Sequence, residues 1–363
     1  MNMARYLETE PYSLGREDKQ RFLLSELNKI TQFHINSCPE YKAILKAYDL
    51  LEIKFNAFED FPLIPVRLFK EYELKSCSSE EIIKTLTSSG TTSQKVSKIF
   101  LDKETSTLQT KVLVKIMQSF LGKKRLPMLI IDTKSILKDR KMFSARGAGI
   151  LGLSTFGRKH TYALNEQMEI DFETIKQFLD KHKDEKIFIF GFTFMIWQYF
   201  YLQLKEKNIT LNLSNSILIH SGGWKKLIDQ AVDNKTFKQN LKKQTGITAI
   251  HDFYGMVEQI GSIFVECEEG HLHAPIFSDI IIRDKMTLEP LAFGEEGLIE
   301  VLSILPRSYP GHVLLTEDIG TILGEDDCSC GRKGKYFTVK GRLAKAEIRG
   351  CSDTHAFEKR DSK

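Results

Sequence analysis

Several features that define other protein classes are scarce or missing in this sequence. Charges occur throughout residues 1–21, so no secretory signal peptide is expected. Cysteine is scarce, with six in 363 residues, which excludes a disulfide framework and favours a reduced, cytoplasmic setting. The net charge is only +4, and the basic residues form no stripe with interleaved aromatic side chains, so nucleic acid is not expected as a partner.

Long apolar runs are also scarce, and only one segment is long enough to be considered as a membrane-spanning helix. Residues 187–204 contain no charged side chain over 18 positions, which is the lower limit for a membrane-spanning helix. Gly191, Thr193 and two glutamines interrupt the run, and its first residues alternate like a buried strand. We therefore expect a strand over 187–191, a turn at Gly191–Thr193 and a helix after it, and no membrane span.

The order of the remaining apolar segments indicates an α/β fold. Strands that alternate with helices predict a mainly parallel sheet covered by helices, with ligands beyond the carboxyl ends of the strands. The expected strands cover 128–131, 187–191, 216–220 and 247–250, and the expected helices cover 16–36, 103–120, 172–182 and 225–245. The glycine-rich stretch 146–152 is expected to be a loop or a close backbone approach.

The pattern changes near residue 278 to short strands separated by turns. The expected strands cover 279–282, 297–303, 311–315, 321–323 and 335–339. Such spacing predicts an antiparallel β subdomain, about residues 278–340, attached to the α/β body.

A loop rich in hydroxyl groups begins after residue 86. Its polar side chains are Thr87, Ser88, Ser89, Thr91, Thr92 and Lys95, grouped around Gly90. Hydroxyls, bare amides and one lysine can hold several phosphate oxygens together. The loop is not a Walker A motif, which has a different glycine spacing, and the alternative reading is a polar surface linker.

Two further polar segments follow expected strands directly. Ser221, Gly222 and Gly223 come after the strand at 216–220, and Tyr254, Gly255 and Glu258 come after the strand at 247–250. Both segments therefore fall where a parallel sheet binds its ligands.

These motifs, with Thr316-Glu-Asp318 and Gly341-Arg342 further on, resemble in order and spacing the adenylate-forming superfamily of acyl- and aryl-CoA ligases. The resemblance extends from about Leu86 to Cys351. It implies an adenylate-forming (AMP-binding) domain over residues 1–340, followed by a hinge and tail over 341–363. In full-length members a small mobile domain follows the hinge, whereas residues 343–363 are too few for a domain core.

The resemblance also implies roles for the residues. The loop from Thr87 to Lys95 would hold the phosphates of ATP, although Ser93 stands where the family has a second glycine. Ser221–Gly223 and Tyr254–Gly255 would bracket the adenine, and Glu258 would hold Mg²⁺. Asp318 would accept hydrogen bonds from the ribose, although the glycine before it is replaced by Glu317. Arg342 would sit at the hinge with Lys345 near it.

The last residues resemble one branch of this superfamily. The segments Val339-Lys-Gly-Arg and Arg349-Gly-Cys-Ser-Asp-Thr-His355 are similar to the acyl-protein synthetases of the LuxE type, the luciferin-component ligases. This likeness implies that ATP activates a fatty acid as acyl-AMP and that the acyl group moves to Cys351. It further implies an acyl-CoA reductase-like partner, and an acyl-transferase (thioesterase) subunit, in a fatty acid reductase complex.

The residues around Cys351 support the same role independently. A glycine precedes the thiol, and Lys345 and Arg349 favour its thiolate form, while His355 is a candidate base. The alternatives are an inert tail cysteine, a short CoA ligase that uses free CoA, and a non-catalytic nucleotide- or acyl-binding subunit.

The remaining cysteines suggest a metal site. Cys267, His273, Cys328 and Cys330 have side chains suited to tetrahedral zinc, and His271 competes with His273 as the imidazole ligand. Such a zinc would be structural and would tie the β subdomain to the body of the protein.

Overall fold

The computed structural model describes residues 3–51, 53–88, 96–137, 145–224 and 231–343. Its α-helices are α1 (Met3–Glu8), α2 (Arg16–Ser37), α3 (Pro39–Ala47), α4 (Leu68–Glu71), α5 (Lys103–Leu121), α6 (Ala145–Ser154), α7 (Phe172–Lys181), α8 (Thr193–Met195), α9 (Leu202–Glu206) and α10 (Asn234–Thr245). A π-helix, Ile196–Tyr201, joins α8 to α9. Within the described ranges, no helix is long and apolar enough to cross a membrane.

Two sheets are formed by the described strands. The small sheet pairs β1 (Lys84–Thr87) with β2 (Lys98–Leu101). The large sheet contains β3 (Leu126–Thr133), β4 (Gly157–Leu164), β5 (Ile187–Phe192), β6 (Ser216–Ser221), β7 (Ala249–Tyr254), β8 (Phe264–Glu266), β9 (Leu272–His273), β10 (Ser278–Arg283), β11 (Glu296–Ser303), β12 (Val313–Glu325) and β13 (Lys335–Arg342). Its spatial order is β10-β11-β12-β13-β9-β8-β7-β6-β5-β3-β4.

The large sheet has a parallel half and an antiparallel half. Strands β4, β3, β5, β6 and β7 pair in parallel, and all pairs from β7 to β10 are antiparallel. β5 and β6 are apolar and buried along almost their whole length, as expected for strands that are covered on both faces. The expected α/β fold is confirmed, and the antiparallel strands continue the same sheet rather than forming a separate one.

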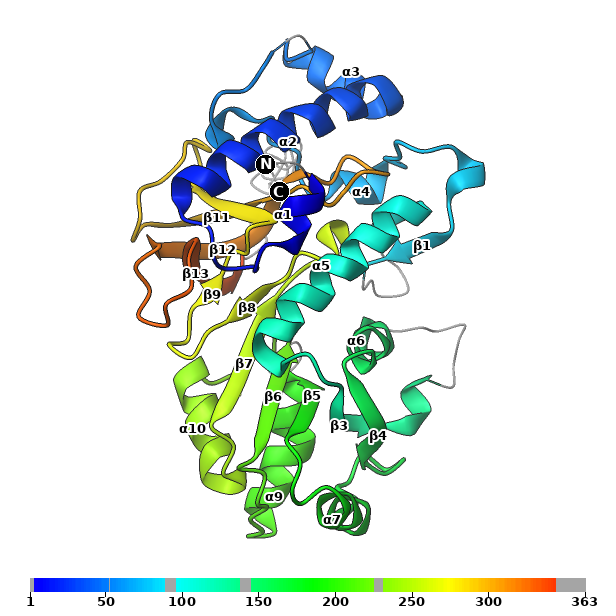
Figure 1. The fold of residues 1–363 in the computed structure, drawn as a ribbon, viewed down its shortest axis with the longest axis vertical. Helices are drawn as coiled ribbons and strands as arrows, with labels where there is room; N and C mark the ends of the chain where they lie inside the picture. The colour runs from blue at the N-terminus through cyan, green and yellow to red at the C-terminus, as the bar shows by residue number, and fades with distance from the viewer. Residues whose placement is uncertain (1–2, 52, 89–95, 138–144, 225–230, 344–363) are drawn as a thin grey trace, which may run out of the picture.

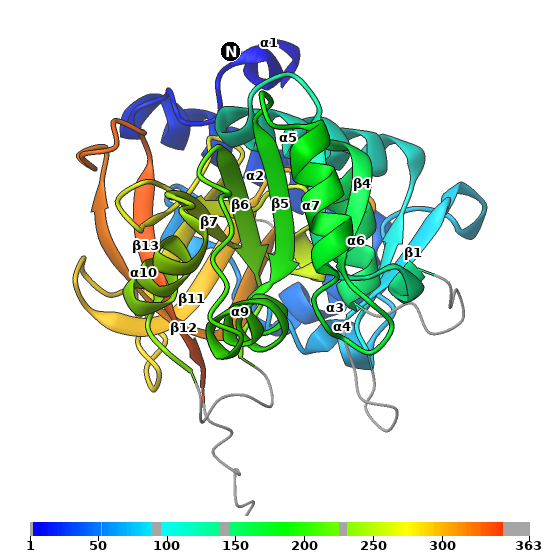
Figure 2. The ribbon, with the colours of Figure 1, turned by 90° about the horizontal axis from the view of Figure 1, so that it is seen from below.

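Helices cover the parallel half on both faces. Val112 and Ile116 of α5 pack in the same core cluster as Phe188 and Phe190 of β5. A second core cluster joins Ile187 and Ile189 to residues of α7, the π-helix, α9 and α10. Figure 2 shows α5 and α9 on opposite sides of β5 and β6.

The antiparallel half carries α2 and α3, which Figure 1 shows at the top of the molecule. α3 packs its apolar side against β10 and β11 in a third core cluster. α2 is also held by a buried ion pair, because Lys19 Nζ lies 3.1 Å from Asp279 Oδ2 in β10. The second oxygen of Asp279 lies 3.1 Å from Lys335 Nζ in β13, so one carboxylate joins one helix and two strands.

Three local predictions are wrong in the structure. Residues 146–152 belong to helix α6 rather than to a loop, although the expected close backbone approach occurs at Gly149. Of the helix expected over 225–245, residues 225–230 lie outside the described residues, 231–233 are not helical, and α10 begins at Asn234, where the Asp233 carboxylate caps it. The two strands expected over 311–315 and 321–323 are one continuous strand, β12.

Candidate active site

The segments Ser221–Gly223 and Tyr254–Gly255 lie side by side at the carboxyl edge of the parallel strands. β6 and β7 pair in register, with Ser221 opposite Phe253. The Ser221 hydroxyl donates a hydrogen bond to the Phe253 carbonyl at 2.9 Å. Gly222 has a φ of 85°, a backbone conformation that glycine adopts without strain, so the chain turns away from the sheet there. The two segments predicted to bracket an adenine are therefore neighbours.

Tyr254, Asp318 and Arg342 form a connected group. The Tyr254 hydroxyl donates to Asp318 Oδ2 at 2.7 Å, and Arg342 Nε lies 3.4 Å from Asp318 Oδ1. Asp318 and Arg342 face each other across β12 and β13. Burial, reinforced by the Asp318 carboxylate, raises the pKa of Tyr254 well above its usual value, so this hydroxyl remains a donor.

Glu258 lies in a one-turn 3₁₀-helix, Val257–Gln259, just beyond the end of β7. Its side chain is buried, and burial raises the pKa of its carboxyl group, an effect opposed by the Ser97 hydroxyl and by Lys70 and Arg342. The neighbouring Gln259 fixes this turn by donating to the carbonyls of Val301 and Gly311. Glu258 is thus a rigidly placed carboxyl group near two cationic side chains.

Ser97, whose hydroxyl lies close enough to Glu258 to affect its pKa, stands at the base of the hydroxyl-rich loop. The Ser88 N–H donates to the Ser97 carbonyl at 3.1 Å, and the Ser97 N–H donates to Ser88 Oγ at 2.9 Å. These bonds close the β1–β2 hairpin, which carries the loop between its strands. Thr87 and Ser88 are therefore located near Glu258, whereas Ser89, Gly90, Thr91, Thr92 and Lys95 lie outside the described residues.

The predicted residues of the tail also lie outside the described residues. These are Lys345, Cys351 and His355. Arg342 is the last predicted site residue that the structure locates, and the Leu343 N–H after it donates to the Glu317 carbonyl at 2.9 Å.

Sequence reasoning missed Ser97, because a lone serine before a strand carries no recognisable motif. It also missed the buried His220, whose Nδ1 lies 2.9 Å from Thr193 Oγ1 and 3.5 Å from Asp252 Oδ1 at the ends of β6 and β7. Their only sequence signal is position, since each lies within two residues of a strand end.

The four predicted metal ligands come together at a separate place. The ligand atoms of Cys267, His273, Cys328 and Cys330 all lie within 4.8 Å of one another. The Cys267 and Cys328 sulfurs are 4.0 Å apart, and Cys330 Sγ lies 3.4 Å from His273 Nε2. Thiolates bound to one tetrahedral zinc at ~2.3 Å would be about 3.8 Å apart, which matches this spacing.

The two histidines that compete as the imidazole ligand both lie close to this cluster. His273 belongs to the four-residue group, whereas His271 only approaches Cys328 Sγ with its Nδ1 at 3.5 Å. Burial lowers the pKa of His273 to about 4, which keeps the imidazole in the neutral form that binds metals. The Arg332 N–H donates to Cys330 Sγ at 3.4 Å, an outer contact that orients the sulfur.

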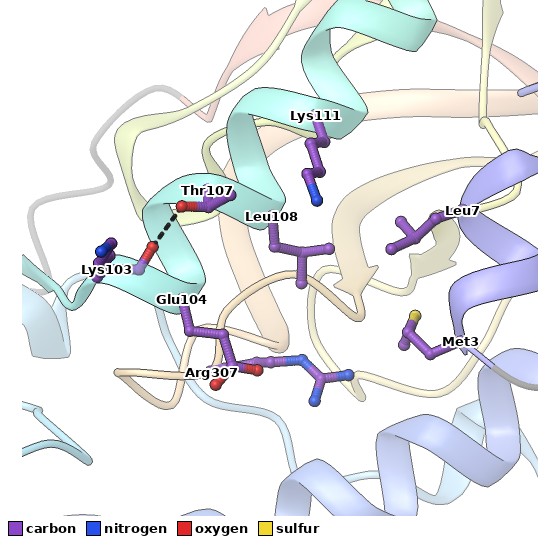
Figure 3. Close-up of a pocket in the computed structure, with 8 residues that line it drawn as sticks. All are labelled: Met3, Leu7, Lys103, Glu104, Thr107, Leu108, Lys111 and Arg307. Atoms are coloured by element: carbon purple, nitrogen blue, oxygen red, sulfur yellow. Dashed lines mark hydrogen bonds between the residues drawn. The ribbon is translucent and has the colours of Figure 1, made fainter.

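A groove of about 540 Å³ lies elsewhere, between α1 and α5 (Figure 3). Met3, Leu7 and Leu108 give it an apolar surface, and Lys111 and Arg307 add positive charge. It contains none of the residues predicted from the sequence.

The fold is that of the adenylate-forming ligases. The structure superposes on 2-hydroxyisobutyryl-CoA ligase in the postadenylation state with 2-HIB-AMP, with a TM-score of 0.70, 14% identity, and coverage of 92% of this chain and 69% of that one. The same ligase with 2-HIB-AMP and CoA in the thioesterification state gives a TM-score of 0.70 at 14% identity, with coverage of 93% of this chain and 72% of that one.

Within this class, the chain belongs to the acyl-protein synthetase, LuxE, family, which matches residues 4–358. A long-chain-fatty-acid–luciferin-component ligase of Aliivibrio fischeri is 25% identical over 333 residues, covering 86% of this chain and 82% of that protein. A protein of the same name from Vibrio harveyi is 24% identical over 352 residues, covering 92% and 87%. The family and the ligase class expected from the sequence are thereby confirmed.

Proposed function

We propose that this enzyme activates a long-chain fatty acid with ATP and transfers the acyl group to its own Cys351. The observation that carries the proposal is the convergence of Tyr254, Glu258, Asp318 and Arg342 at one edge of the sheet. These residues come from separate segments of the chain, and the family to which the chain belongs supplies the reaction class.

In the first step, a carboxylate oxygen of the acid attacks the α-phosphorus of ATP. A new O–P bond forms, the bond to the β-phosphate oxygen breaks, and pyrophosphate leaves with that electron pair. The loop from Thr87 to Lys95 would hold the departing phosphates, and Asp318 would accept hydrogen bonds from the ribose. Positioned donors and charges of this kind stabilise the charge that develops on phosphorus.

Glu258 fits a ligand for Mg²⁺. It is a buried hard-oxygen donor, and the Ser97 hydroxyl near it belongs to the base of the proposed phosphate loop. Magnesium bound there would supply charge neutralisation for the pyrophosphate.

In the second step, the Cys351 thiolate attacks the acyl carbonyl, and AMP leaves as the thioester forms. Lys345 and Arg349 would favour the thiolate, and His355 would accept the thiol proton. A reductase-like partner would then receive the acyl group, and a thioesterase-type subunit would supply fatty acid, as the family resemblance implies.

The decisive experiment separates the two steps. Acid-dependent exchange of pyrophosphate with ATP, over a series of acid lengths, measures the first step. The Cys351→Ala variant should retain this exchange, within about two-fold, and lose the acyl label that survives denaturation and is released by hydroxylamine.

Cys77→Ala provides the matched control, because Cys77 is far from the tail in sequence and belongs to no cysteine cluster among the described residues. Full labelling of Cys351→Ala would refute the acceptor role, and label transfer to free CoA instead would identify a CoA ligase. Absence of exchange with every acid would point to a non-catalytic subunit.

We also propose a structural zinc at Cys267, His273, Cys328 and Cys330. The support is the spacing of the four ligand atoms and the N–H contact from Arg332 to Cys330. A closed set of three thiolates and one imidazole leaves no open position for catalysis, so the metal would stabilise the fold.

A further inference from the structure

One of the three cysteines in the proposed zinc site is reached from the surface. Cys267 is completely buried and Cys328 is nearly so, whereas Cys330 is only half-buried. A surface pocket of about 440 Å³ is lined by Cys330 together with Tyr12 and Arg332. Cys330 is therefore the cysteine of this site that a small solute meets first.

A hydrogen-bond donor and a positive charge lie beside the Cys330 sulfur. The backbone N–H of Arg332 donates to Cys330 Sγ at 3.4 Å, and the Arg332 side chain lies beside the same sulfur. The guanidinium group is held 4.6 Å from the centroid of the Phe120 ring and forms an ion pair with Glu268. Zinc binds cysteine as the thiolate, and the neighbouring cation favours the same form, which is the form that reacts with oxidants.

Two further sulfurs lie within reach of Cys330. The ligand atoms of Cys267, His273, Cys328 and Cys330 all lie within 4.8 Å of one another. A cysteine that has been oxidised to a sulfenic acid condenses with a thiol beside it to form a disulfide, which is reversible. The cluster therefore contains both the thiol that an oxidant reaches first and a second thiol that can complete the bond.

We propose that Cys330 is a modification site at which a hydroperoxide oxidises the cysteine cluster and releases its zinc. The inference rests on the proposed structural zinc and is independent of the proposed acyl transfer. It gives these residues a second role besides holding the fold, because the stability of the protein then depends on the concentration of peroxide.

The chemistry takes place in two steps. The Cys330 thiolate attacks one oxygen of the peroxide, so that an S–O bond forms, the O–O bond breaks, and the other oxygen leaves as hydroxide or alkoxide. The thiolate of Cys267 or Cys328 then attacks the sulfenic sulfur, an S–S bond forms, and the S–O bond breaks with loss of hydroxide. The leaving anions take protons from water. Two thiolates are thereby oxidised to one disulfide, and the peroxide is reduced to water and an alcohol, or to water alone.

Zinc is left with two of its four ligands, His273 and one thiolate, and dissociates. Because a disulfide replaces the metal, a dithiol reductant with added zinc should restore the original site.

The test follows zinc and thiols in the Cys351→Ala protein, so that the tail thiol does not compete for the oxidant. Hydrogen peroxide should release about one zinc per chain to a metallochromic indicator. Peptide mass spectrometry should then find Cys330 in a disulfide with Cys267 or Cys328. With dimedone present, the sulfenic acid should be trapped on Cys330.

Arg332→Gln keeps all four ligands and the backbone N–H that contacts Cys330. Loss of the guanidinium group should slow the release of zinc by peroxide about five-fold or more, while the untreated variant still contains zinc. Lys333→Gln is the matched control, because this exposed neighbour donates to the Asp326 carbonyl rather than to the cluster. It should release zinc at the rate of the parent protein.

The outcomes separate the two proposals. Untreated protein with less than about a tenth of an equivalent of zinc would refute the zinc site and this inference together. Protein that keeps its zinc in peroxide, with all three thiols still open to alkylation after denaturation, would refute the modification site alone. Dimedone adducts on Cys267 or Cys328 in place of Cys330, or undiminished release from Arg332→Gln, would refute Cys330 as the thiol that is attacked first.

Discussion

At the scale of single residues, Asp318 is held by two side chains of the candidate site. A carboxylate offers about four lone-pair directions. Tyr254 and Arg342 occupy one on each oxygen, at 2.7 and 3.4 Å. The remaining directions are therefore available to a ligand with two neighbouring hydroxyl groups, such as ribose.

Replacing Asp318 by asparagine should weaken nucleotide binding. The neutral amide loses the charge-assisted hydrogen bonds, which are worth ~1.5–3 kcal/mol each, so the KM for ATP should rise about ten- to one-hundred-fold. Glu317→Gln is the control, since this exposed neighbour contributes its backbone carbonyl, which the substitution preserves, to a contact with Leu343. Equal ATP dependence in both variants would exclude the ribose role.

Two buried histidines, His34 and His312, make stability depend on pH. Their rings are 4.9 Å apart, and burial lowers the pKa of His34 to about 3 and that of His312 well below its usual value. His34 Nδ1 contacts Ser76 Oγ at 2.7 Å, and His312 Nε2 contacts Thr31 Oγ1 at 2.9 Å. Both rings are therefore neutral in the folded protein.

The unfolded chain binds protons at these histidines below pH ~6.5, whereas the folded chain does not until a much lower pH. The free energy of unfolding is therefore unaffected by these two groups above pH ~6.5, and it falls as the pH is lowered from 6.5 toward 3. Each histidine should contribute about 1.4 kcal/mol per pH unit to this slope, measured by urea unfolding. His34→Gln should reduce the slope, and the control His160→Gln, at an exposed position, should leave it unchanged.

At the scale of elements, the sequence predicts segments whose pattern is set locally and misses those decided by packing. The buried strands β3, β5 and β6 are correctly located because their apolar runs are continuous. Helix α6 is missed because its glycines disfavour a helix, and only contact with Phe192 explains Gly149. The single strand β12 is missed because its middle, around Asp318, is polar where it borders the site.

The residues of the candidate site also divide into those with a local sequence signal and those without one. Tyr254, Glu258 and Asp318 could be found because they belong to motifs with a fixed order. Ser97 and His220 could not, because their contacts arise only where separate segments of the chain meet.

The attachment of α2 depends on the buried Lys19–Asp279 pair. Lys19→Met should lower the free energy of unfolding by about 3 kcal/mol, since removing one partner of a buried pair leaves an uncompensated charge. Lys335 remains beside Asp279 and keeps the loss at the lower end of the range. Arg21→Met, on the exposed part of the same helix, should change stability by less than about 0.5 kcal/mol. Similar urea midpoints for the two variants would contradict the role of the Lys19–Asp279 ion pair in holding α2.

At the scale of the whole molecule, the large sheet narrows to a seam at β9, within its antiparallel half. The two-residue strand β9 pairs with β8 on one side and with β13 on the other, through two residue pairs each. His273 lies in β9, Cys267 follows β8, and Cys328 and Cys330 lie between β12 and β13. The proposed zinc would therefore bind ligands from both sides of the seam.

Metal analysis of the purified protein should find about one zinc per chain. Removing it with a chelator should lower the melting temperature by about 10 °C, because a few kcal/mol are lost and each shifts Tm by ~2–4 °C in large domains. Cys328→Ser should reproduce the loss, while Cys77→Ser should not. Less than a tenth of an equivalent of zinc in the untreated protein would refute the site.

The position of β9 has a consequence for synthesis on the ribosome. Its partner β13 lies about sixty residues later in the sequence, so β9 is made well before the strand that completes its pairing. Until β13 emerges, the nascent chain has an open strand edge at the centre of its future sheet, where pairing with another chain can begin. Cells that make this protein should therefore depend on chaperones most strongly between the emergence of β9 and the emergence of β13 from the ribosome.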